Sequence, residues 1–516
     1  MSRPAIVFIG FMGAGKSAAL DIAQLSGLET TEIDELMEGK LGMPIAEAFE
    51  RDGEDAFRAR EAEAVGELLE RADGGAIALG GGSVLSERVR EALSRHVVVW
   101  LQIDGEEAWR RIEDSGRPLA RSAEDVARLL AVRQPLYEQL ADVVLPQGDP
   151  GLVARALPSI RALIELPAGT KLLWATSASG EYPVLVGPGL LGAGPWPLEG
   201  RRFCVTDTTV GGLYADRLEP LEATVAVEPG EAAKTMAEAE RVLRELARAG
   251  MTREDHLVAL GGGVVGDLAG FCAHTYQRGV PVIQVPTSLV AQVDSAYGGK
   301  TGVDLPEGKN YVGAYHLPAA VIADTATLAS LPAEELAAGF VEALKTGLLA
   351  GGSLWERVRS IETLDATDLG EVVFECARYK CEVVAADERD AGLRAVLNLG
   401  HTVGHAIEAA SGYGRYRHGE AVGLGLLAAL RLSKAKALRD EVEAILGRLR
   451  LPTAIDSAIE VDAILDAVQR DKKRTSQGVG FVLISEPGQP RVGQLVEPDR
   501  VRAAVAELVP AESAVR

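Results

Sequence analysis

The sequence predicts an α/β protein in which parallel sheets covered by helices are followed by a mostly helical region. Short runs of β-branched and apolar residues alternate with helical stretches, as they do in parallel sheets. Most of these runs end in Gly, Pro or Asp, which are typical of loops at strand ends. From about Leu328 the periodicity becomes helical, and Ala, Leu, Glu and Arg dominate.

The first predicted domain covers residues 1–166. We expect strands at residues 4–10, Ala76–Leu79 and Val97–Ile103, and helices from about Lys16 and at Gly151–Glu165. The segment Leu166–Thr170 contains Pro and Gly and is predicted to be a linker.

The second and third predicted domains cover residues 171–327 and 328–516. The second contains the β-rich runs PVLVGPG, RRFCVTD, TVAVEPG, HLVALGGG and PVIQVPTS. These runs predict an open α/β sheet with ligand-binding loops at its strand ends. The third domain is predicted to be mostly helical.

Composition limits the possible partners and the compartment. Apolar residues make up 47% and charged residues 25% of the chain, as in soluble globular proteins. No apolar run of about 18 residues and no secretory leader is seen, so no membrane association is expected. A net charge of −22 argues against nucleic acid. Four cysteines without a CxxC pair indicate a reducing cytoplasm.

A phosphate-binding motif follows the first predicted strand. Residues Gly10–Ser17 (GFMGAGKS) fit the pattern GxxxxGK[ST] between a strand and a helix. Backbone amides at Gly13, Ala14 and Gly15 would surround the phosphates of ATP. Lys16 would reach the β/γ oxygens, and the Ser17 hydroxyl suits Mg²⁺. The alternative, a glycine-rich turn with a chance lysine, is disfavoured by the flanking strand and helix.

Carboxylates and arginines suggest the phosphate acceptor. Glu32 and Asp34 are predicted at the end of a short strand, on one side at a spacing of two. Arginines can clamp a carboxylate, and aspartate can accept bonds from hydroxyls. This set predicts a pocket for a polyhydroxylated carboxylic acid, although each arginine taken alone fits an exposed surface charge. Its other members are Arg58, the turn Gly80–Gly82, Arg117 and Arg133.

Over about 165 residues these motifs resemble shikimate kinase, in the same order along the chain. The resemblance implies that Asp34, Arg58, Gly81 and Arg133 hold shikimate. It implies that Asp34 orients or deprotonates the attacking hydroxyl, that Lys16 and Arg117 act on the transferring phosphate, and that Arg110 lies near adenine. The family usually has Asp where this chain has Glu32, which affects the expected metal geometry.

A second nucleotide site is indicated in the second domain. The glycine-rich segment Gly261–Asp267 follows a predicted strand, and Asp207 ends another. Glycine-rich loops and a carboxylate at strand ends are typical of Rossmann-like dinucleotide sites. A polar loop from Glu231 to Lys234 follows a third predicted strand. Each loop taken alone fits an ordinary turn.

A metal site is indicated in the helical region. Three of the seven histidines, His401, His405 and His418, fall within 18 residues. His401 and His405 share one helical face, and Glu342 can supply an oxygen. Two histidines and one carboxylate are typical of a catalytic metal. Spacing leaves open which of His401 and His405 binds metal, and a cluster of core histidines is the alternative.

Cationic residues crowd the same motifs, which indicates a phosphorylated, carboxylated sugar as substrate. They are Arg278, Lys300, Lys309, Lys345, Lys380, Arg394 and the pair Lys472–Lys473. Several lie beside Gly or apolar residues, unlike the charges of a solvated face.

From about residue 171 to 516 the chain resembles 3-dehydroquinate synthase. The motifs are VPTSLVAQVDSAYGGKTGVD, EGKN, GFVEALKTG, LNLGHTVGHAIE and RHGEAVG. The resemblance implies Glu342, His401 and His418 as ligands of Zn²⁺ or Co²⁺. The implied NAD⁺ contacts are Asp207, Glu231, Lys234, Gly262, Gly263, Val264, Asp267, Thr287 and Ser288. The implied substrate contacts are Arg278, Asp294, Lys300, Lys309, Asn310, Lys345, Lys380, Arg394, Asn398, His405 and Lys472 or Lys473.

Among these substrate contacts, the resemblance implies catalytic roles for Lys300, Lys345, Lys380, Arg394 and His405. Arg278 is expected to reach the site of a partner in a homodimer. At Asp390 the family more often has Glu.

The predicted fold is therefore a P-loop NTPase-like domain, a Rossmann-like NAD domain and a helical metal-binding subdomain. The predicted function is a bifunctional enzyme of the shikimate pathway. Three alternatives remain: a kinase for another polyol acid such as gluconate, a different sugar-phosphate cyclase or metal-dependent polyol dehydrogenase, or one half, more readily the kinase, acting as a non-catalytic scaffold.

Overall fold

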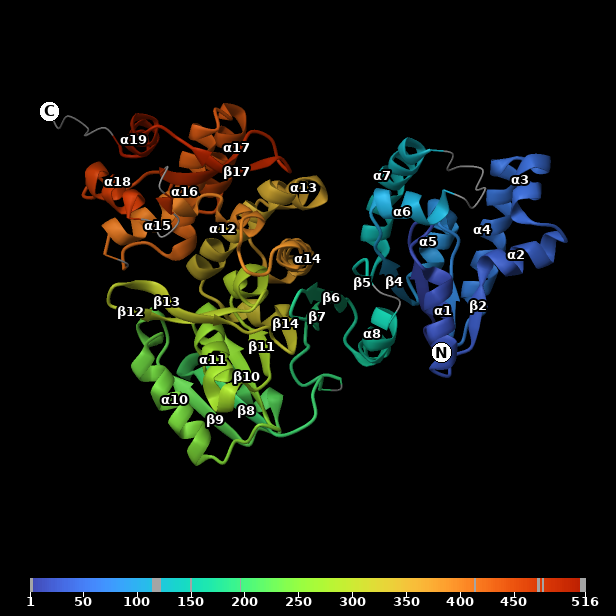
Figure 1. The fold of residues 1–516 in the computed structure, drawn as a ribbon, viewed down its shortest axis with the longest axis horizontal. Helices are drawn as coiled ribbons and strands as arrows, with labels where there is room; N and C mark the ends of the chain where they lie inside the picture. Colours follow the sequence, from blue (N-terminus) through green and yellow to red (C-terminus); the bar gives the residue numbers. More distant parts are fainter. Residues whose placement is uncertain are drawn as a thin grey trace. The chain divides into compact units, whose positions relative to one another are not determined.

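The computed structural model describes residues 3–113, 122–148, 151–194, 196–412, 414–470, 474–475 and 478–510. The chain forms two compact units (Figure 1). Unit 1 comprises Met1–Ala175, Pro183–Leu185 and Ala193–Pro197, and unit 2 comprises Thr176–Tyr182, Val186–Gly192 and Leu198–Arg516. The three predicted domain ranges remain predictions.

Unit 1 is built on a parallel sheet in the order β2-β3-β1-β4-β5-β6. Its strands are β1 (Ile6–Ile9), β2 (Thr30–Glu32), β3 (Ala76–Ala78), β4 (Val97–Leu101), β5 (Val143–Leu145) and β6 (Lys171–Ser177). All four residues of β1 are buried, and Ile6 pairs with Ala76 on one side and Val97 on the other. A strand buried on both faces explains the unbroken apolar run of the sequence.

Helices connect and flank these strands, and α1 and α8 share a buried cluster with the sheet. The helices are α1 (Lys16–Leu25), α2 (Ile33–Leu41), α3 (Ile45–Asp52), α4 (Glu54–Arg71), α5 (Glu87–Leu93), α6 (Gly105–Ile112), α7 (Ala123–Leu140) and α8 (Gly151–Ala162). Ala23 of α1 and Ile160 of α8 share one buried cluster with Phe8 and Val99 of the sheet. The sheet therefore holds the loop between β1 and α1 on a rigid base.

Unit 2 contains parallel strands in the order β14-β11-β10-β8-β9. Its strands are β8 (Arg202–Asp207), β9 (Ala223–Val227), β10 (His256–Gly261), β11 (Val282–Pro286) and β14 (Ala320–Asp324), and β7 spans Gly180–Gly187. Helices α9 (Thr208–Tyr214), α10 (Met236–Arg248) and α11 (Gly263–Thr275) connect its strands. The predicted α/β class is confirmed in both units.

The remaining part of unit 2 is mostly helical, as predicted (Figure 1). Its helices are α12 (Ala333–Ala350), α13 (Gly352–Ser360), α14 (Gly370–Ala386), α15 (His401–Ala410), α16 (His418–Leu432), α17 (Lys436–Arg448), α18 (Val461–Gln469) and α19 (Pro498–Ala506). Two antiparallel elements accompany them: the hairpin β12 (Lys300–Leu305) with β13 (Gly308–Tyr315), and the strands β15 (Arg474–Thr475), β16 (Gly478–Ile484) and β17 (Pro490–Leu495).

Helix α16 lies at the centre of these helices and packs against α12, α15, α17 and α19. Every residue of α12 from Leu336 to Leu349 is buried. A helix that is buried all round carries charged residues only where they have partners. Glu342 and Lys345 lie within this buried run. No described helix has an apolar stretch of the length that a bilayer core requires.

Candidate active sites

The phosphate-binding motif forms a loop between β1 and α1, as the sequence predicts. Gly15, with φ 90°, ends the loop at the N-cap of α1. Gly13 has φ 81°, and a Cβ there would lie 3.3 Å from the Ile112 side chain of α6. Lys16 Nζ donates to the carbonyls of Gly10 (2.9 Å) and Phe11 (3.0 Å). The loop thus places an ammonium group beside the N-terminus of α1, which suits phosphate.

A cavity of about 220 Å³ lies against this loop. Its lining comprises Met12, Gly13, Gly15, Lys16, Ser17, Glu32, Asp34, Ala78, Leu79 and Gly81. Ser17 Oγ donates to Glu32 Oε1 at 2.5 Å. A hydroxyl beside a carboxylate supplies the oxygen ligands that Mg²⁺ prefers, so these residues fit the ion.

The prediction that Glu32 and Asp34 share one strand is wrong. Glu32 ends β2, but Asp34 lies in the first turn of α2. Carboxylates in a first turn interact favourably with the positive end of the helix dipole. Both side chains nevertheless line the cavity.

The predicted acceptor residues meet at the turn Gly80–Gly82. Arg133 Nη1 (3.3 Å) and Tyr137 Oη (2.5 Å) both donate to the Gly81 carbonyl. A Cβ on Gly82 would lie 2.4 Å from the Arg58 guanidinium carbon, and a Cβ on Gly80 would lie 3.2 Å from Asp34 Oδ1. Only glycines allow these charged groups to approach the turn so closely.

Burial perturbs two of these groups. Arg133 is buried, and desolvation lowers the pKa of its guanidinium, while the ring of Phe11 lies 5.8 Å away. Burial also raises the pKa of Tyr137 to about 12, so its hydroxyl stays a donor. A buried guanidinium beside an open cavity is suited to bind an anion.

Helix α6 carries two adjacent arginines, Arg111 and the predicted Arg110, and it is Arg111 that contacts the phosphate-binding loop. Arg110 is exposed and pairs with Glu107 at 2.6 Å. Arg111 Nη1 donates to the Gly13 carbonyl at 2.9 Å, and its Nε donates to Glu107. These arginines lower the pKa of Glu107 to about 2. Arg117 lies outside the described residues.

In unit 2 the predicted dinucleotide loops lie at the carboxyl ends of β8, β9, β10 and β11. Gly262 is the N-cap of α11, and a Cβ there would lie 3.2 Å from Ser288 Oγ. A Cβ on Gly263 would lie 3.0 Å from Ser295 Oγ. Val264 follows in the first turn of α11, and the Thr287 amide donates to the Gly261 carbonyl. This narrow cradle at a helix N-terminus fits a pyrophosphate.

Polar side chains surround the cradle. Asp207 Oδ1 accepts from the amides of Thr209 (2.9 Å) and Val210 (2.8 Å), so this carboxylate also caps α9. Lys234 is buried and pairs with Asp267 at 2.6 Å, with Glu231 at 3.8 Å. Burial opposes the charge of Lys234, but Asp267 and Glu231 outweigh it and raise the pKa of this lysine.

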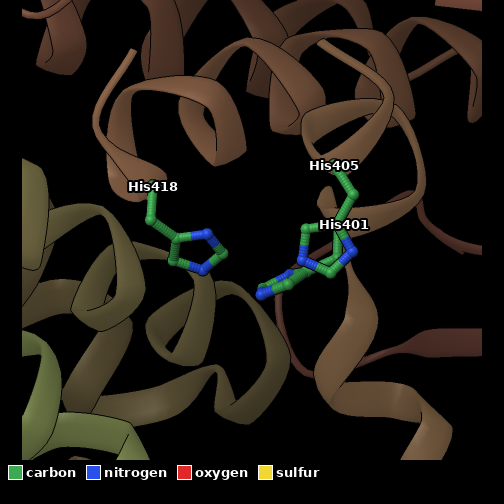
Figure 2. Close-up of side chains that lie close together, drawn as sticks. All are labelled: His401, His405 and His418. Atoms are coloured by element: carbon green, nitrogen blue, oxygen red, sulfur yellow. The ribbon is translucent and has the colours of Figure 1, made fainter. Parts of the chain in front are cut away.

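Helices α12, α15 and α16 bring the metal candidates together. Figure 2 shows His401 and His405 facing His418, and one ligand nitrogen from each lies within 4.8 Å of the others. Glu342 Oε1 lies 3.5 Å from His401 Nε2 and 3.4 Å from His418 Nε2. Glu342 Oε2 forms an ion pair with Lys345 Nζ at 2.6 Å, so Oε1 is the oxygen that faces the two imidazole nitrogens. A buried carboxylate left in this state fits a metal ligand.

The charges around this cluster favour a cation. Burial opposes ionisation of Glu342, but Lys345, His401 and His418 outweigh it and hold the pKa of Glu342 well below its usual range. Burial opposes a charged His418, but Glu342 and Glu408 outweigh it and raise the pKa of His418 to about 10. Without a metal, the carboxylates therefore draw a proton onto His418. A divalent ion can replace that proton.

The predicted substrate residues fall into pairs around the same place. Lys380 Nζ lies 2.7 Å from Asp294 Oδ1, and Lys309 Nζ lies 3.5 Å from Glu408 Oε1. Lys300 pairs with Asp390. The Asp294 and Glu408 pairs hold cations beside Glu342 and His418.

Three further predicted contacts form hydrogen bonds in which one partner is a backbone group. Arg394 Nη1 donates to the Glu388 carbonyl (2.7 Å), and Asn398 Nδ2 donates to that of Ala395 (3.0 Å). The backbone N–H of Asn310 donates to the side-chain oxygen Oδ1 of Asp304. Arg278 lies in the turn after α11 with φ 71°. Lys472 and Lys473 lie outside the described residues.

The sequence interpretation missed several residues that touch the predicted ones. Glu61 accepts from Arg58 Nη1 (2.6 Å) and from Ser83 Oγ (2.8 Å). Glu408 lies 3.4 Å from His418 Nδ1, and Tyr137 shares the Gly81 carbonyl with Arg133. Helical spacing is a signal for three of them: Glu61 follows Arg58 by three positions, Tyr137 follows Arg133 by four, and Glu408 follows His405 by three. No such signal marks Glu388 or Arg111.

Comparisons with known families match both parts of the chain. Residues 12–155 match the family model described as shikimate kinase. Residues 224–338 and 339–474 match the models described as 3-dehydroquinate synthase N-terminal and 3-dehydroquinate synthase C-terminal. The 3-dehydroquinate synthase of Symbiobacterium thermophilum is 44% identical over 345 residues, which are 62% of this chain and 96% of that protein.

Solved structures resemble the larger part. The 2-epi-5-epi-valiolone synthase of Streptomyces hygroscopicus subsp. jinggangensis 5008, solved with NAD⁺ and Zn²⁺, is 27% identical with a TM-score of 0.56. The match covers 63% of this chain and 96% of that one. A 2-deoxy-scyllo-inosose synthase is 24% identical with a TM-score of 0.58, over 66% of this chain and all of that one, and shares the fold.

Proposed function

The chain belongs to the 3-dehydroquinate synthase family and also carries a shikimate kinase domain, and on this premise we propose how its residues divide two reactions. It is a bifunctional shikimate-pathway enzyme. One activity phosphorylates shikimate with ATP to shikimate 3-phosphate. The other converts 3-deoxy-D-arabino-heptulosonate 7-phosphate to 3-dehydroquinate and phosphate.

In the kinase, the loop Gly13–Ser17 binds the ATP phosphates, and Ser17 with Glu32 holds Mg²⁺. Both side chains line the cavity and already bond each other. Lys16 leaves the Gly10 and Phe11 carbonyls to meet the phosphate oxygens, as charge neutralisation in phosphoryl transfer requires. Arg110 and Arg117 complete the nucleotide site in this assignment.

Shikimate lies against the turn Gly80–Gly82. Arg58 and Arg133 bind its carboxylate, and Gly81 supports its ring. Asp34 accepts a hydrogen bond from the shikimate hydroxyl that attacks the transferring phosphate. Since Asp34 and Ser17 line one cavity, the hydroxyl and the phosphate meet there.

In the synthase, Glu342, His401 and His418 hold Zn²⁺ or Co²⁺. The observation that carries this assignment is the buried Glu342 carboxylate, whose Oε1 lies within 3.5 Å of two imidazole nitrogens while Oε2 pairs with Lys345. A metal held there would supply Lewis-acid polarisation of a substrate hydroxyl, and NAD⁺ would supply a reversible hydride acceptor. His405, on the same helix, faces the substrate phosphate.

NAD⁺ binds at the ends of β8, β9, β10 and β11. Gly262, Gly263 and Val264 meet its pyrophosphate, and Asp207 accepts from a ribose hydroxyl. The remaining contacts are Glu231, Lys234, Asp267, Thr287 and Ser288. The narrow glycine cradle supports this placement, because any larger residue would fill it.

The substrate lies between the NAD⁺ cradle and the metal ligands. The cations Lys300, Lys309, Lys345, Lys380, Arg394 and Lys472, with Asp294, Asn310 and Asn398, bind its carboxylate, hydroxyls and phosphate. Lys345 stays charged although it is buried: burial opposes its charge, but Glu342 and Asp294 raise its pKa. In this assignment the Lys345 ammonium pairs with the metal ligand Glu342 and also contacts the substrate.

A metal-exchange assay tests the synthase assignment. EDTA should abolish phosphate release from the heptulosonate, and Zn²⁺ or Co²⁺ should restore it. Mg²⁺ should restore only shikimate-stimulated ADP release. Full phosphate release by His401→Ala would refute the metal assignment, and ADP release that does not respond to shikimate would refute the kinase assignment.

We further place the enzyme in the cytoplasm as a homodimer through the synthase half, with Arg278 reaching the partner's site. Arg278 forms no ion pair among the described residues and lies in an exposed turn. A mixture of Arg278→Ala and His401→Ala proteins tests this, because a mixed dimer retains one complete site. Activity in the mixture above that of either variant is expected, and no gain would refute the shared site.

A further inference from the structure

Arg394 is a buried cation held by backbone carbonyls. Arg394 is only 2% exposed. Nη1 donates to the Glu388 carbonyl at 2.7 Å, and Nη2 donates to the Gly298 carbonyl at 3.2 Å. Among the described residues no carboxylate forms an ion pair with it. Carbonyls satisfy N–H groups without cancelling the charge, and an uncompensated buried charge is costly. Such a guanidinium suits a site that an anion completes.

The Glu388 side chain is turned away from Arg394. Its carboxylate accepts from the Ser179 amide at 2.8 Å and from Ser179 Oγ at 2.7 Å. Glu388 is 6% exposed, and the exposed Arg389 lies 3.4 Å from Oε1. Glu388 thus joins two groups that are distant in sequence: Ser179 through its side chain and Arg394 through its carbonyl.

The second carbonyl is held in a similar way. The Gly298 amide donates to Tyr182 Oη at 3.1 Å, and Tyr182 is buried. Gly298 has φ 78°, and a Cβ there would lie 2.6 Å from Val384 Cγ2 and 2.8 Å from Arg394 Nη2. Only glycine therefore allows this carbonyl to meet the guanidinium.

Both supports lead back to one short segment of unit 2. Ser179 precedes β7, and Tyr182 lies on it. Successive hydrogen bonds link Ser179 to Glu388, Glu388 to Arg394, Arg394 to Gly298 and Gly298 to Tyr182, and the chain itself joins Tyr182 back to Ser179. Neither Ser179 nor Tyr182 contacts Arg394 directly among these bonds, so each acts through an intermediate residue.

We propose that Ser179, Tyr182 and Glu388 are positioning residues of the synthase, which hold the Arg394 guanidinium where it binds an anionic group of the substrate. This inference rests on the proposed role of Arg394 as a substrate contact. A guanidinium fixed at both terminal nitrogens loses little freedom when its ligand binds. Loosening it should therefore weaken substrate binding more than it slows the chemical steps.

Steady-state kinetics of the full chain test the proposal. Glu388→Ala should raise the synthase KM for the heptulosonate phosphate about tenfold and change kcat less than about threefold. Glu388→Gln, which keeps a side-chain oxygen for Ser179, should stay within about threefold of the unchanged KM. Ser179→Ala and Tyr182→Phe should raise KM in the same direction. The kinase activity of the same protein controls for folding.

A double-mutant cycle separates positioning from general damage. In an Arg394→Ala background, Glu388→Ala should change KM by less than about twofold, because the group that it positions is gone. An equal KM increase in both backgrounds, or no increase in either, would overturn the inference. If Arg394→Ala alone leaves the synthase KM and kcat unchanged, the proposed role of Arg394 fails instead.

Discussion

Glu342 Oε1 lies 3.4 Å from Nε2 of His418, although the two residues come from different helices, α12 and α16. Their meeting depends on a close backbone contact. A Cβ built on Gly419 would lie only 1.8 Å from the carbonyl oxygen of Ala338, one turn before Glu342. Gly419 therefore lets the start of α16 touch α12, which brings His418 within reach of the carboxylate.

Replacing this glycine should open the metal site. In Gly419→Ala the new methyl forces α16 away from α12, at a cost of about 1–3 kcal/mol for overpacking. We expect Zn²⁺ affinity to fall at least about tenfold, measured by competition with a chelating dye, and synthase activity to fall with it. The kinase rate of the same protein should stay unchanged.

Gly423→Ala on the same buried helix is the matched control. Its Cβ would lie 3.3 Å from the tip of the Leu446 side chain, which can move aside. Equal loss of Zn²⁺ affinity in the two variants would show that the contact between Gly419 and Ala338 has no special role.

Metal binding should release a proton from His418 at mildly alkaline pH. The pKa of about 10 means that His418 is protonated in the metal-free protein at pH 8, whereas a metal ligand must be neutral. Because the proton competes below the pKa, metal affinity should rise as pH rises toward 10. Calorimetric titration at pH 8 in buffers of different ionisation enthalpy should detect about one proton per Zn²⁺ bound.

An ordinary histidine, with a pKa near 6.5, would release almost no proton at pH 8. A release near zero would therefore contradict the charge balance derived for Glu342, Glu408 and His418.

Glu32 should govern the Mg²⁺ requirement of the kinase. Its carboxylate accepts from Ser17 at 2.5 Å, so its removal takes an oxygen from the proposed ion site. In Glu32→Ala we expect the Mg²⁺ concentration for half-maximal ADP release to rise about tenfold, while the shikimate KM changes less than about twofold. Glu32→Asp should keep activity within about threefold, because water can bridge the shorter arm.

Glu35→Ala provides the control for this experiment, since Glu35 lies in the first turn of α2 but does not line the cavity. An unchanged Mg²⁺ requirement in Glu32→Ala would exclude Glu32 from the ion site.

Glu61 should hold Arg58 ready for shikimate. Its carboxylate is buried between Arg58 and Ser83. Glu61→Gln keeps the volume but removes the charge, so Arg58 loses its close, buried anionic partner. We expect the shikimate KM to rise about tenfold and the ATP KM to change less than about twofold.

Glu54→Gln is the matched variant, because Glu54 is more exposed and lies 3.5 Å from Arg58 Nε. Exposed pairs contribute little, so this variant should behave as the unchanged protein. Equal effects of the two substitutions, or an unchanged shikimate KM in Glu61→Gln, would contradict the assignment.

The features that were predictable from sequence are those encoded locally. The segment Gly10–Ser17 carries its loop, its lysine and its hydroxyl in eight consecutive residues, and α15 begins at His401 with His405 one turn later. The fold class, the two families and the bifunctional enzyme are confirmed by the sheets and by the comparisons.

Features that depend on tertiary packing were not predictable. A three-residue segment such as Glu32–Asp34 fits a strand and the start of a helix equally well, which explains the wrong placement of Asp34. Ser179 and Glu388 are 209 positions apart, so their contact leaves no local pattern. The need for glycine at position 419 arises from the backbone of another helix.

The central claim is that one chain carries two separate active sites, and selective inactivation tests it most directly. Both rates, shikimate-stimulated ADP release and phosphate release from the heptulosonate phosphate, should be measured on the full chain and on its Lys16→Ala and His401→Ala variants. In Lys16→Ala, shikimate-stimulated ADP release should fall at least about 100-fold while phosphate release is kept. In His401→Ala, phosphate release should fall by a similar factor while ADP release is kept. Loss of both rates in either variant, or full retention of the targeted rate, would contradict the account.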